Sequence, residues 1–348
     1  MSEESTREAL RLPKVAVIGS GSWGTAVTSL LGPRCDLIEI WSHELRVAEG
    51  INRTHHNPVQ LPDFELPKQA HATCSLAEAV QQANAVLLVV PSAYLRDTCI
   101  SLAPYLAPDV PVLVLTKGVE RETGCLMADV AAQELGHPER IAVLSGPNHA
   151  EEISHGTISA AVVAANDERV GTFFQRLLVC PAFRVYVTDD VCGVEVCAAV
   201  KNVMAIACGI ASALGAGDNT LAALMTRGLA EMSRIASSLG ADPITCMGLA
   251  GMGDLIVTCT SRHSRNRTFG QAFVNGESLA DYQARTSMVV EGAEAAASVL
   301  QLAQERDVQV PITQAVYDLL YNEMPLSEAI DALLGRQPTE EFYGMERT

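Results

Sequence analysis

Positive charge is scarce in this chain of 348 residues, which has 24 Lys and Arg against 41 Asp and Glu and a formal net charge of −17. Only four residues are lysine: Lys14, Lys68, Lys117 and Lys201. A surface of this sign repels nucleic-acid backbones and anionic lipids. We therefore expect no nucleic-acid partner and no membrane insertion, and each lysine becomes a candidate for a specific role.

A disulfide framework is also missing. The ten cysteines are scattered from Cys35 to Cys259, form no CxxC pair and have no histidine at zinc-ligand spacing. Many lie in apolar runs, where a thiol behaves as a small hydrophobic group. We expect reduced thiols, no bound metal and a cytoplasmic location.

Signals for secretion or membrane insertion are not evident. Residues 1–14 are polar and lack the apolar core of a signal peptide. Apolar strips such as Ala85–Val90 fall far short of the ~20 residues of a spanning helix. Hydrophobic residues make up 48% of the chain and charged residues 19%, which predicts a soluble folded protein. At ~100–200 residues per domain, the length predicts two domains.

The first half of the chain has the pattern of an α/β domain. Nearly continuous apolar strips are typical of strands buried on both faces of a parallel sheet, and they cover residues 15–18, 37–41, 85–90, 112–115, 141–144, 160–165 and 183–187. Helical stretches such as 75–82 and 123–135 lie between them. The alternation predicts a Rossmann domain, doubly wound with a mostly parallel sheet, over residues 1–188.

The second half has the pattern of an all-α domain. A long apolar stretch covers 194–214, and a stripe spaced by three and four follows it up to residue 239. We expect Asp218 or Asn219 to cap the second of these helices and Gly240 to end it. Asp242 followed by Pro243 is a further helix start. Other helical patterns cover 293–304, 312–322 and 326–334, so we expect a helical domain over 189–335 and a polar tail over 336–348.

A glycine-rich turn gives the clearest functional signal. The strip 15–18 runs into Gly19-Ser20-Gly21-Ser22-Trp23-Gly24, which opens a predicted helix. In G-x-G-x-x-G the first glycine permits a tight turn, the second lets the backbone approach a pyrophosphate, and the third allows close helix packing. The pattern predicts NAD(H) or NADP(H) at the N-terminus of that helix, against the alternative of a merely structural turn.

The choice between the two cofactors depends on the end of the second strand. A carboxylate normally follows this strand and binds the ribose 2′-hydroxyl. Here Ser42 and His43 follow it, which leaves room for a 2′-phosphate. The alternative is that Glu39 or Glu44 serves as the acid. We expect tolerance of NADP(H), with His43 among the cofactor residues.

Unusual residues follow three other predicted strands. They are Pro91-Ser92, Lys117-Gly118 and Gly146-Pro147-Asn148. The carboxyl ends of parallel strands line the ligand crevice of an open sheet. A structural turn explains Gly146-Pro147 but not a lysine directly after a buried strand. Lys117 is therefore a candidate to hold an anionic substrate or to polarise a carbonyl.

Lys201 lies on an apolar helical stripe with Val194, Ala198, Ala205 and Cys208. Burial of an ammonium group lowers its pKa, which suits a general acid or base near neutral pH. The alternatives are a side chain that reaches a nearby surface, or a structural ion pair with Glu195 or Asp254. We favour the functional interpretation, with Asn202 beside it.

A basic segment follows a glycine-rich turn that ends at Asp254. Arg262, His263, Arg265 and Arg267 lie within six residues, with Ser264 and Asn266 between them. Arginine binds phosphate with two parallel hydrogen bonds, and serine or asparagine adds neutral donors. The alternative is a solvated basic turn.

With these motifs assembled, the chain from about Lys14 to Leu334 resembles the bacterial type of NAD(P)-dependent glycerol-3-phosphate dehydrogenase. The strings that carry the resemblance are GSGSWGTA, VVPS, TKG, SGPNHAEE, AAVKNVMAIACGI, TRGLAEM, GLAGMGDLIVTCTS, SRNRTFG and VVEG. The family reduces dihydroxyacetone phosphate to sn-glycerol 3-phosphate and runs the reverse oxidation. The resemblance implies a Rossmann domain, a helical domain, a homodimer and a supply of glycerol phosphate for glycerophospholipids.

The resemblance also implies roles for individual residues. Lys201 is similar to the catalytic acid/base, Asp254 and Thr258 to groups that orient it, and Arg265 with Asn266 to a clamp on the substrate phosphate. The full substrate set is Lys117, Gly146, Asn202, Asp254, Thr258, Ser264, Arg265 and Asn266. The full cofactor set is Gly19, Gly21, Ser22, Trp23, Gly24, His43, Pro91, Lys117, Asn148, Ala150, Arg265, Val289 and Glu291.

Two positions depart from the family pattern. Asn148-His149 stand where a small hydroxyl residue and an aromatic are more common, and Ala198 lies near a customary glycine. Two other functions remain open. One is a related two-domain dehydrogenase that acts on a 3-hydroxy acid or an acyl thioester, which would need other groups in place of the SRN clamp. The other is a non-catalytic NAD(H) sensor, which needs neither a buried lysine nor a phosphate clamp.

Overall fold

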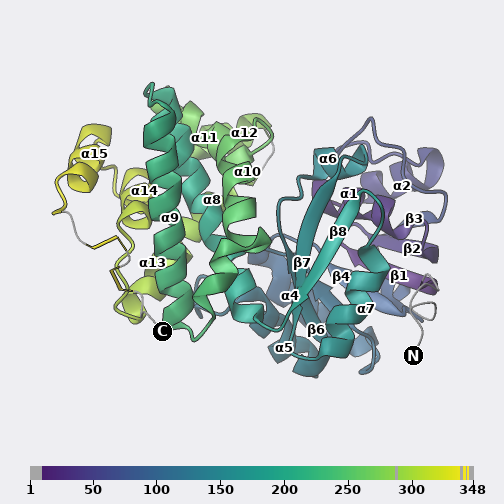
Figure 1. Ribbon diagram of the computed structural model, residues 1–348. Helices are drawn as coiled ribbons and strands as arrows, with labels where there is room; N and C mark the ends of the chain where they lie inside the picture. The colour runs from purple at the N-terminus through teal and green to yellow at the C-terminus, as the bar shows by residue number, and fades with distance from the viewer. Residues whose placement is uncertain (1–9, 287–288, 338–339, 342, 345–348) are drawn as a thin grey trace. The chain divides into compact units, whose positions relative to one another are not determined.

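The computed structural model describes residues 10–286, 289–337, 340–341 and 343–344 (Figure 1). It divides into two compact units. The first contains the chain up to Thr116 with Met127–Leu144 and Asn148–Val191, and the second contains Lys117–Leu126, Ser145–Pro147 and the chain from Cys192. Two short segments that follow strands thus belong to the second unit. The predicted polar tail, 336–348, lies partly outside the described residues.

The first unit is built on an eight-stranded sheet in the order β3-β2-β1-β4-β5-β6-β7-β8. Its strands are β1 (Leu12–Ile18), β2 (Cys35–Trp41), β3 (Ala70–Thr73), β4 (Ala85–Leu88), β5 (Val112–Val114), β6 (Ile141–Ser145), β7 (Ser159–Ala165) and β8 (Phe183–Thr188). β1 pairs in parallel with both β2 and β4. The strand order reverses between β1 and β4, and this is where open α/β sheets bind ligands. The predicted Rossmann fold is confirmed.

Helices on the sheet of the first unit are short (Figure 1). They are α1 (Ser22–Leu31), α2 (Leu45–Thr54), α3 (Leu76–Val80), α4 (Leu95–Leu102), α5 (Met127–Leu135), α6 (Ala150–Ser154) and α7 (Glu168–Leu178). The helix expected from residue 123 begins only at Met127, because 117–126 forms a turn closed by the bridge between Val119 and Leu126. Seven apolar strips form strands, most of them buried; the last, β8 at the edge of the sheet, alternates buried and exposed residues.

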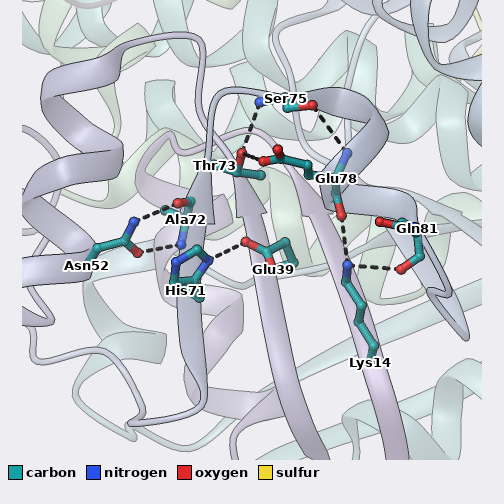
Figure 2. Close-up of polar contacts among 9 residues, drawn as sticks. All are labelled: Lys14, Glu39, Asn52, His71, Ala72, Thr73, Ser75, Glu78 and Gln81. Carbon is teal, nitrogen blue, oxygen red and sulfur yellow. Dashed lines mark hydrogen bonds and ion pairs between the residues drawn. The ribbon is translucent and has the colours of Figure 1, made fainter.

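β3 was not predicted, because its sequence AHAT is short and not apolar enough to stand out. Side chains hold it in place (Figure 2). The Asn52 amide donates to the Ala72 carbonyl at 2.7 Å and accepts from the Ala72 N–H at 2.8 Å. Beside it, the Lys14 ammonium donates to the carbonyls of Glu78 and Gln81. Lys14 therefore anchors the end of α3 to β1 and has a structural role.

The second unit is helical, as expected. Its helices are α8 (Val191–Ala213), α9 (Asp218–Ser238), α10 (Asp254–Thr260), α11 (Arg265–Val274), α12 (Leu279–Thr286), α13 (Glu291–Glu305), α14 (Pro311–Tyr321) and α15 (Leu326–Leu334). The N-cap of α9 is Gly217, so the predicted caps Asp218 and Asn219 are wrong by one or two positions. Asp242 does cap a short 3₁₀ helix, accepting from the Ile244 N–H at 2.9 Å.

α8 is the core helix of the second unit. Its 23 residues are long and apolar enough to cross a membrane by length and composition alone, so the expectation that no apolar run approaches this length is wrong. However, 83% of its apolar window is buried inside the protein. Neighbouring helices approach so closely that a Cβ on Gly209 would lie 2.1 Å from the Arg267 carbonyl oxygen, and one on Gly292 2.5 Å from that of Asn202. Burial by its own unit explains the apolar composition of α8.

A buried carboxylate links α9 to α14. Glu231 accepts from the backbone N–H groups of Ile312 and Thr313 at 2.6 and 3.1 Å and from the Thr313 hydroxyl at 3.0 Å. Burial raises the pKa of Glu231 from 4.5 to about 7, although these hydrogen bonds oppose the rise. The carboxylate thus caps the N-terminus of α14, and the loss of its hydration shell is what disfavours its charged form.

This pKa predicts how stability depends on pH. Between pH 4.5 and about 7, the folded protein binds more of a proton at Glu231 than the unfolded chain does, because the pKa is higher in the folded state. The free energy of unfolding should therefore decrease as the pH rises through this range, by on the order of 3 kcal/mol. Glu231→Gln should remove most of that slope. Urea unfolding at a series of pH values measures it, with Glu328→Gln on α15 as the control. An equal slope in the Glu231→Gln variant would contradict the prediction.

Candidate active site

The glycine-rich turn of the first unit has the geometry that a dinucleotide needs. Gly19 has φ +126°, and a Cβ there would lie 2.8 Å from the Val89 carbonyl oxygen. A Cβ on Gly24 would lie 2.1 Å from the Gly19 carbonyl oxygen. A Cβ on Gly21 would meet no atom within 4 Å, so the space in front of this residue is open. The first and third glycines are therefore required by the fold, and the second leaves the turn accessible.

The helix that follows presents an uncapped N-terminus. α1 begins at Ser22, its N-cap is Gly21, and no side chain caps it. Its first turn holds no acidic residue, and the Nε1 atom of the partly buried Trp23 has no hydrogen-bond partner in the part of the chain that the structure describes. Free N–H groups at a helix N-terminus favour an anion. These residues fit the pyrophosphate of NAD(H) or NADP(H).

Two residues that the sequence did not predict, Asn57 and Gln60, form hydrogen bonds that hold the glycine-rich turn. The Asn57 amide donates to the Ser20 carbonyl and to the Thr25 hydroxyl, and the Gln60 amide oxygen accepts from Ser22 Oγ at 2.6 Å. Both residues come from the loop after α2, far from the motif in sequence. Only the fold brings them there, so no local pattern could have found them.

The end of β2 carries a buried serine in place of a carboxylate. Ser42 is fully buried, and its Oγ accepts from Ser20 Oγ at 2.8 Å. Glu39 lies inside β2, where its Oε1 is 2.6 Å from His71 Nδ1 (Figure 2). That contact argues against Glu39 as the ribose ligand. His43 and Glu44 are exposed, and Glu44 is the N-cap of α2.

The other predicted cofactor residues of the first unit follow β4 and β6. Pro91 precedes the short 3₁₀ helix Ser92–Tyr94, and Ala150 begins α6. Asn148 is 8% exposed, and its Nδ2 atom has no hydrogen-bond partner among the described residues. A buried amide donor without a partner is costly unless a ligand accepts from it. The departure at Asn148 is thus compatible with a contact to the cofactor.

Two lysines share one carboxylate within the second unit. Asp254 begins α10 and is 1% exposed. Lys201 Nζ, from the middle of α8, lies 2.5 Å from Asp254 Oδ1, and Lys117 Nζ lies 3.1 Å from Oδ2. The structure therefore joins three residues that are far apart in sequence. Of the partners considered for Lys201, Asp254 is the one in contact.

Hydroxyl groups complete this cluster. Thr258, one turn after Asp254 on α10, accepts from Lys201 Nζ at 3.1 Å and donates to the Asp254 carbonyl at 2.6 Å. Ser145 Oγ donates to Asp254 Oδ2 at 3.3 Å. Ser145 was not predicted, because it is the last residue of a buried strand and resembles any small core residue. The cluster thus holds two ammonium groups, one carboxylate and two hydroxyls.

Burial lowers the pKa of Lys201 from 10.5 to about 8, although the neighbouring Asp254 carboxylate opposes this shift and Lys117 adds to it. For Asp254, burial raises the pKa, but the two lysines outweigh it and hold that pKa below its usual value. Asp254 therefore stays ionised, while Lys201 can gain or lose a proton close to neutral pH.

An amide network extends from this cluster to α11 and α13. Asn266 Nδ2 donates to Asn202 Oδ1 at 3.0 Å, and its Oδ1 accepts from the Gly292 N–H at 2.9 Å. Asn202 Nδ2 lies 3.4 Å from Glu291 Oε2. Both asparagines are buried. The network fixes the predicted residues Asn202, Asn266 and Glu291 relative to each other.

The basic segment separates into structural and free groups. Ser264 is the buried N-cap of α11 and accepts from the Arg267 N–H at 3.3 Å. Arg267 Nη2 donates to Ser212 Oγ at 3.4 Å, which ties it to α8. Arg265 is exposed and has no ion-pair partner among the described residues. Arg262 and Arg265 are thus the exposed arginines of this segment, and Arg265 lies at the start of α11.

The remaining predicted residues have less defined roles. Gly146 has φ +146°, which lets the chain turn after β6 toward the cluster. Val289 is 42% exposed just before α13. Among the described residues, no group of three or more His, Cys, Asp or Glu side chains could hold a metal ion.

Removing the Thr258 hydroxyl tests the cluster with little change in shape. Thr258→Val should lower kcat about tenfold, because the Lys201 ammonium loses a fixed acceptor, and should leave the KM for the reduced cofactor unchanged. Thr260→Val is a matched control, since Thr260 lies on the same helix and its hydroxyl donates to the Ile256 carbonyl. Steady-state kinetics of both variants decides; an unchanged kcat in Thr258→Val would contradict the role.

Comparison with known proteins places this site in a family. Residues 14–171 match the family model of the NAD-dependent glycerol-3-phosphate dehydrogenase N-terminus, and 190–331 match that of its C-terminus. The chain is 43% identical over 337 residues to a glycerol-3-phosphate dehydrogenase [NAD(P)+] of Thermobifida fusca, which covers 96% of this chain and 100% of the relative. It is 44% identical over 329 residues to that of Streptomyces griseus, with 94% and 98% covered.

Solved structures agree. The crystal structure of glycerol-3-phosphate dehydrogenase from Coxiella burnetii has a TM-score of 0.88 and 34% identity, covering 93% of this chain and 99% of that one. A ketopantoate reductase from Ralstonia eutropha, at 18% identity and a TM-score of 0.60, shares the fold alone. The chain belongs to the NAD-dependent glycerol-3-phosphate dehydrogenase family.

Proposed function

We propose that this protein is an NAD(P)-dependent sn-glycerol-3-phosphate dehydrogenase, which interconverts dihydroxyacetone phosphate and sn-glycerol 3-phosphate. The observation that carries the proposal is the buried Lys201–Asp254–Lys117 cluster in a chain of this family. A sensor of NAD(H) needs no buried lysine with a pKa near 8. A 3-hydroxy acid or an acyl thioester would make no use of the exposed Arg265 at the start of α11 as a phosphate ligand.

When bound, the nicotinamide supplies or accepts the hydride. The chain supplies the proton and the position. Lys201 in its ammonium form donates a proton to the carbonyl oxygen of dihydroxyacetone phosphate, and in the reverse direction its neutral amine takes the proton from the hydroxyl group. Asp254 and Thr258 contact the Lys201 ammonium group and hold it in a position from which it donates the proton in reduction and accepts it in oxidation.

Other residues bind and orient the two ligands. Arg265 and Asn266, with Ser264, Asn202, Lys117 and Gly146, are proposed to bind the substrate. Gly19, Gly21, Ser22, Trp23, Gly24, His43, Pro91, Asn148 and Ala150 are proposed to bind the cofactor from the first unit, and Lys117, Arg265, Val289 and Glu291 from the second. Distant binding of the phosphate fixes the orientation of the carbonyl, which lowers the entropic part of the barrier.

We propose residues 1–188 as the cofactor domain and 189–335 as the substrate domain, with 336–348 as a tail. We further propose a homodimer in the cytoplasm that supplies glycerol phosphate for glycerophospholipid synthesis. The division into compact units near Val191 and Cys192 supports the domain boundary, and the relatives named above, which this chain matches over 98–100% of their length, support the activity.

The pKa of Lys201 predicts opposite pH profiles for the two directions. Reduction needs the ammonium form, so kcat/KM for dihydroxyacetone phosphate, which reports the free enzyme, should fall as pH rises through about 8. Oxidation needs the neutral amine, so kcat/KM for glycerol 3-phosphate should fall as pH drops below about 8. Initial rates at fixed ionic strength measure both profiles. Profiles of the same sign in both directions would exclude Lys201 as the titrating group.

A direct assay tests the function. Purified protein with NADH or NADPH should lose the near-ultraviolet absorbance of the reduced nicotinamide when dihydroxyacetone phosphate is added. The two cofactors measured side by side give the preference. An acetoacetyl thioester and a 3-keto acid are the competing substrates, and turnover of either in place of dihydroxyacetone phosphate would overturn the proposal.

A further inference from the structure

A hollow lies entirely within the helical unit and contains none of the residues proposed above to bind the cofactor or the substrate. It has a volume of about 720 Å³, within the ~300–1,000 Å³ range of small-molecule sites. Its walls come from the C-terminal half of α8, one face of α9, and α14 and α15. Apolar side chains dominate these walls, among them Ile210, Leu224, Val316, Leu319, Ile330 and Leu333. We call it the α9 groove.

Three arginines lie along the same groove. Arg227 and Arg234 are seven residues apart on α9 and share a face, and Arg336 follows α15. None of the three forms an ion pair within the part of the chain that the structure describes. Arg227 donates to the Glu341 carbonyl and Arg336 to the Gln309 side chain, both neutral oxygens. No carboxylate among the described residues thus lies within ion-pair distance of these guanidinium groups.

Arg234 is the most buried of the three arginines, and the charged groups around it affect its pKa. Burial lowers the pKa of Arg234, and Arg227 and Arg336 lower it further, while Glu231 opposes the shift. Glu231 is the acidic residue among the groove's lining, and its oxygens are already bonded to the start of α14. Arg234 Nη1 is buried without a hydrogen-bond partner under the ring of Tyr343. Three guanidinium groups that make no ion pair with a described residue, in a chain of net charge −17, indicate an anionic ligand.

We propose that the α9 groove binds a monomeric single-chain amphiphile, a long-chain carboxylate. The carboxylate contacts Arg227 and Arg336 at the basic end, and the alkyl chain lies along the apolar face toward Thr220 and Leu224. From Thr220 to Arg227 the helix rises about 10 Å at ~1.5 Å per residue, and apolar side chains of α14 and α15 extend the wall. The proposal is independent of the dehydrogenase activity.

Chain length and charge give the test its two readouts. Titration calorimetry of the full chain with carboxylates of eight, ten and twelve carbons, all kept monomeric, should show affinity rising roughly fourfold per buried methylene. The alcohol of twelve carbons should bind about tenfold more weakly than the carboxylate. Arg336→Gln, at an exposed position, should reduce carboxylate affinity by about tenfold and leave the alcohol unchanged.

A pair of neighbouring alanines provides a matched control for the location. Ala223 lines the groove and is exposed, so Ala223→Trp should fill it and abolish binding. Ala222 is also exposed on α9 but does not line the groove, and Ala222→Trp should bind normally. Circular dichroism confirms that both variants are folded.

Three results would overturn the proposal. Equal binding of the alcohol and the carboxylate would show that the arginines are not the head-group site. Equal loss of binding in both tryptophan variants would place the ligand elsewhere. If Ala223→Trp changes the molar mass by light scattering while no amphiphile binds the wild-type protein, the groove holds a second copy of the chain instead.

Discussion

Lys201→Met is expected to lower kcat for dihydroxyacetone phosphate reduction at least ~1,000-fold, because general acid–base catalysis contributes about 10²–10⁴ and the side chain is also part of the ion cluster. Methionine keeps the length and apolar character of the stem, which lies in the core of α8. The Asp254 carboxylate retains Lys117, Ser145 and Thr258 as partners, so the fold should survive. Stopped-flow or steady-state absorbance of the reduced cofactor measures the loss.

Two controls separate chemistry from binding. The dissociation constant for NADH, measured by fluorescence, should stay within about twofold of the wild type, because the glycine-rich turn belongs to the other unit. Lys68→Met removes an exposed lysine and should leave kcat unchanged. If Lys201→Met retained more than about a tenth of wild-type turnover, Lys201 would be only a structural ion-pair member.

The fold of the first unit could be predicted because most of its strands are continuously apolar, although β8 at the edge of the sheet alternates buried and exposed residues. Burial between helices requires that composition, and short apolar strips show it directly. β3 could not be found this way, since Ala70–Thr73 is held by the Asn52 amide and not by its own hydrophobicity. The N-cap of α9 was missed for a related reason. Asp218 is a strong capping residue, but Gly217 takes the position and Asp218 begins the helix.

Site residues could be predicted where a charged side chain occurs in an otherwise apolar segment. Lys201 on an apolar stripe and Lys117 after a buried strand are such residues, and both lie in the cluster. Ser145 fits a buried strand end and gave no signal. Asn57 and Gln60 come from a loop whose position depends on the whole first unit. Sequence patterns therefore indicate groups with unusual chemistry, and tertiary structure alone identifies the ordinary groups that hold them.

The acidic composition acquires a specific meaning at this cluster. Two ammonium groups share one carboxylate, so with both lysines protonated the cluster carries one net positive charge in a protein of net charge −17. Because the pKa of Lys201 is about 8, gain or loss of its proton near this pH switches the net charge of the cluster between +1 and 0. An anionic substrate in the vicinity would stabilise the ammonium form and raise the pKa of Lys201, which increases the fraction of Lys201 that holds a proton for a bound ketone.

Arg265→Ala is expected to raise the KM for dihydroxyacetone phosphate about 100-fold, because a bidentate guanidinium–phosphate contact is lost while Lys201 and its partners stay in place. Arg265 is exposed at the start of α11 and has no protein carboxylate to pair with among the described residues, so its removal should not affect folding. Steady-state kinetics at fixed cofactor concentration measures the change. Arg262→Ala is the matched control, since Arg262 is also exposed three residues earlier and its Nε lies 3.5 Å from His263 Nε2.

Rescue distinguishes a phosphate ligand from a general loss of shape. Without added phosphate, the Arg265→Ala variant should reduce unphosphorylated dihydroxyacetone about as slowly as the wild type, because that substrate has no phosphate group for the arginine to bind. Inorganic phosphate should stimulate this slow reaction in the wild type and much less in the variant, since only the wild type keeps the group that orders the anion beside the ketone. Equal stimulation in both proteins would assign the phosphate to other donors, with Lys117 and the Asn266 network next in line, and would leave Arg265 as a surface residue.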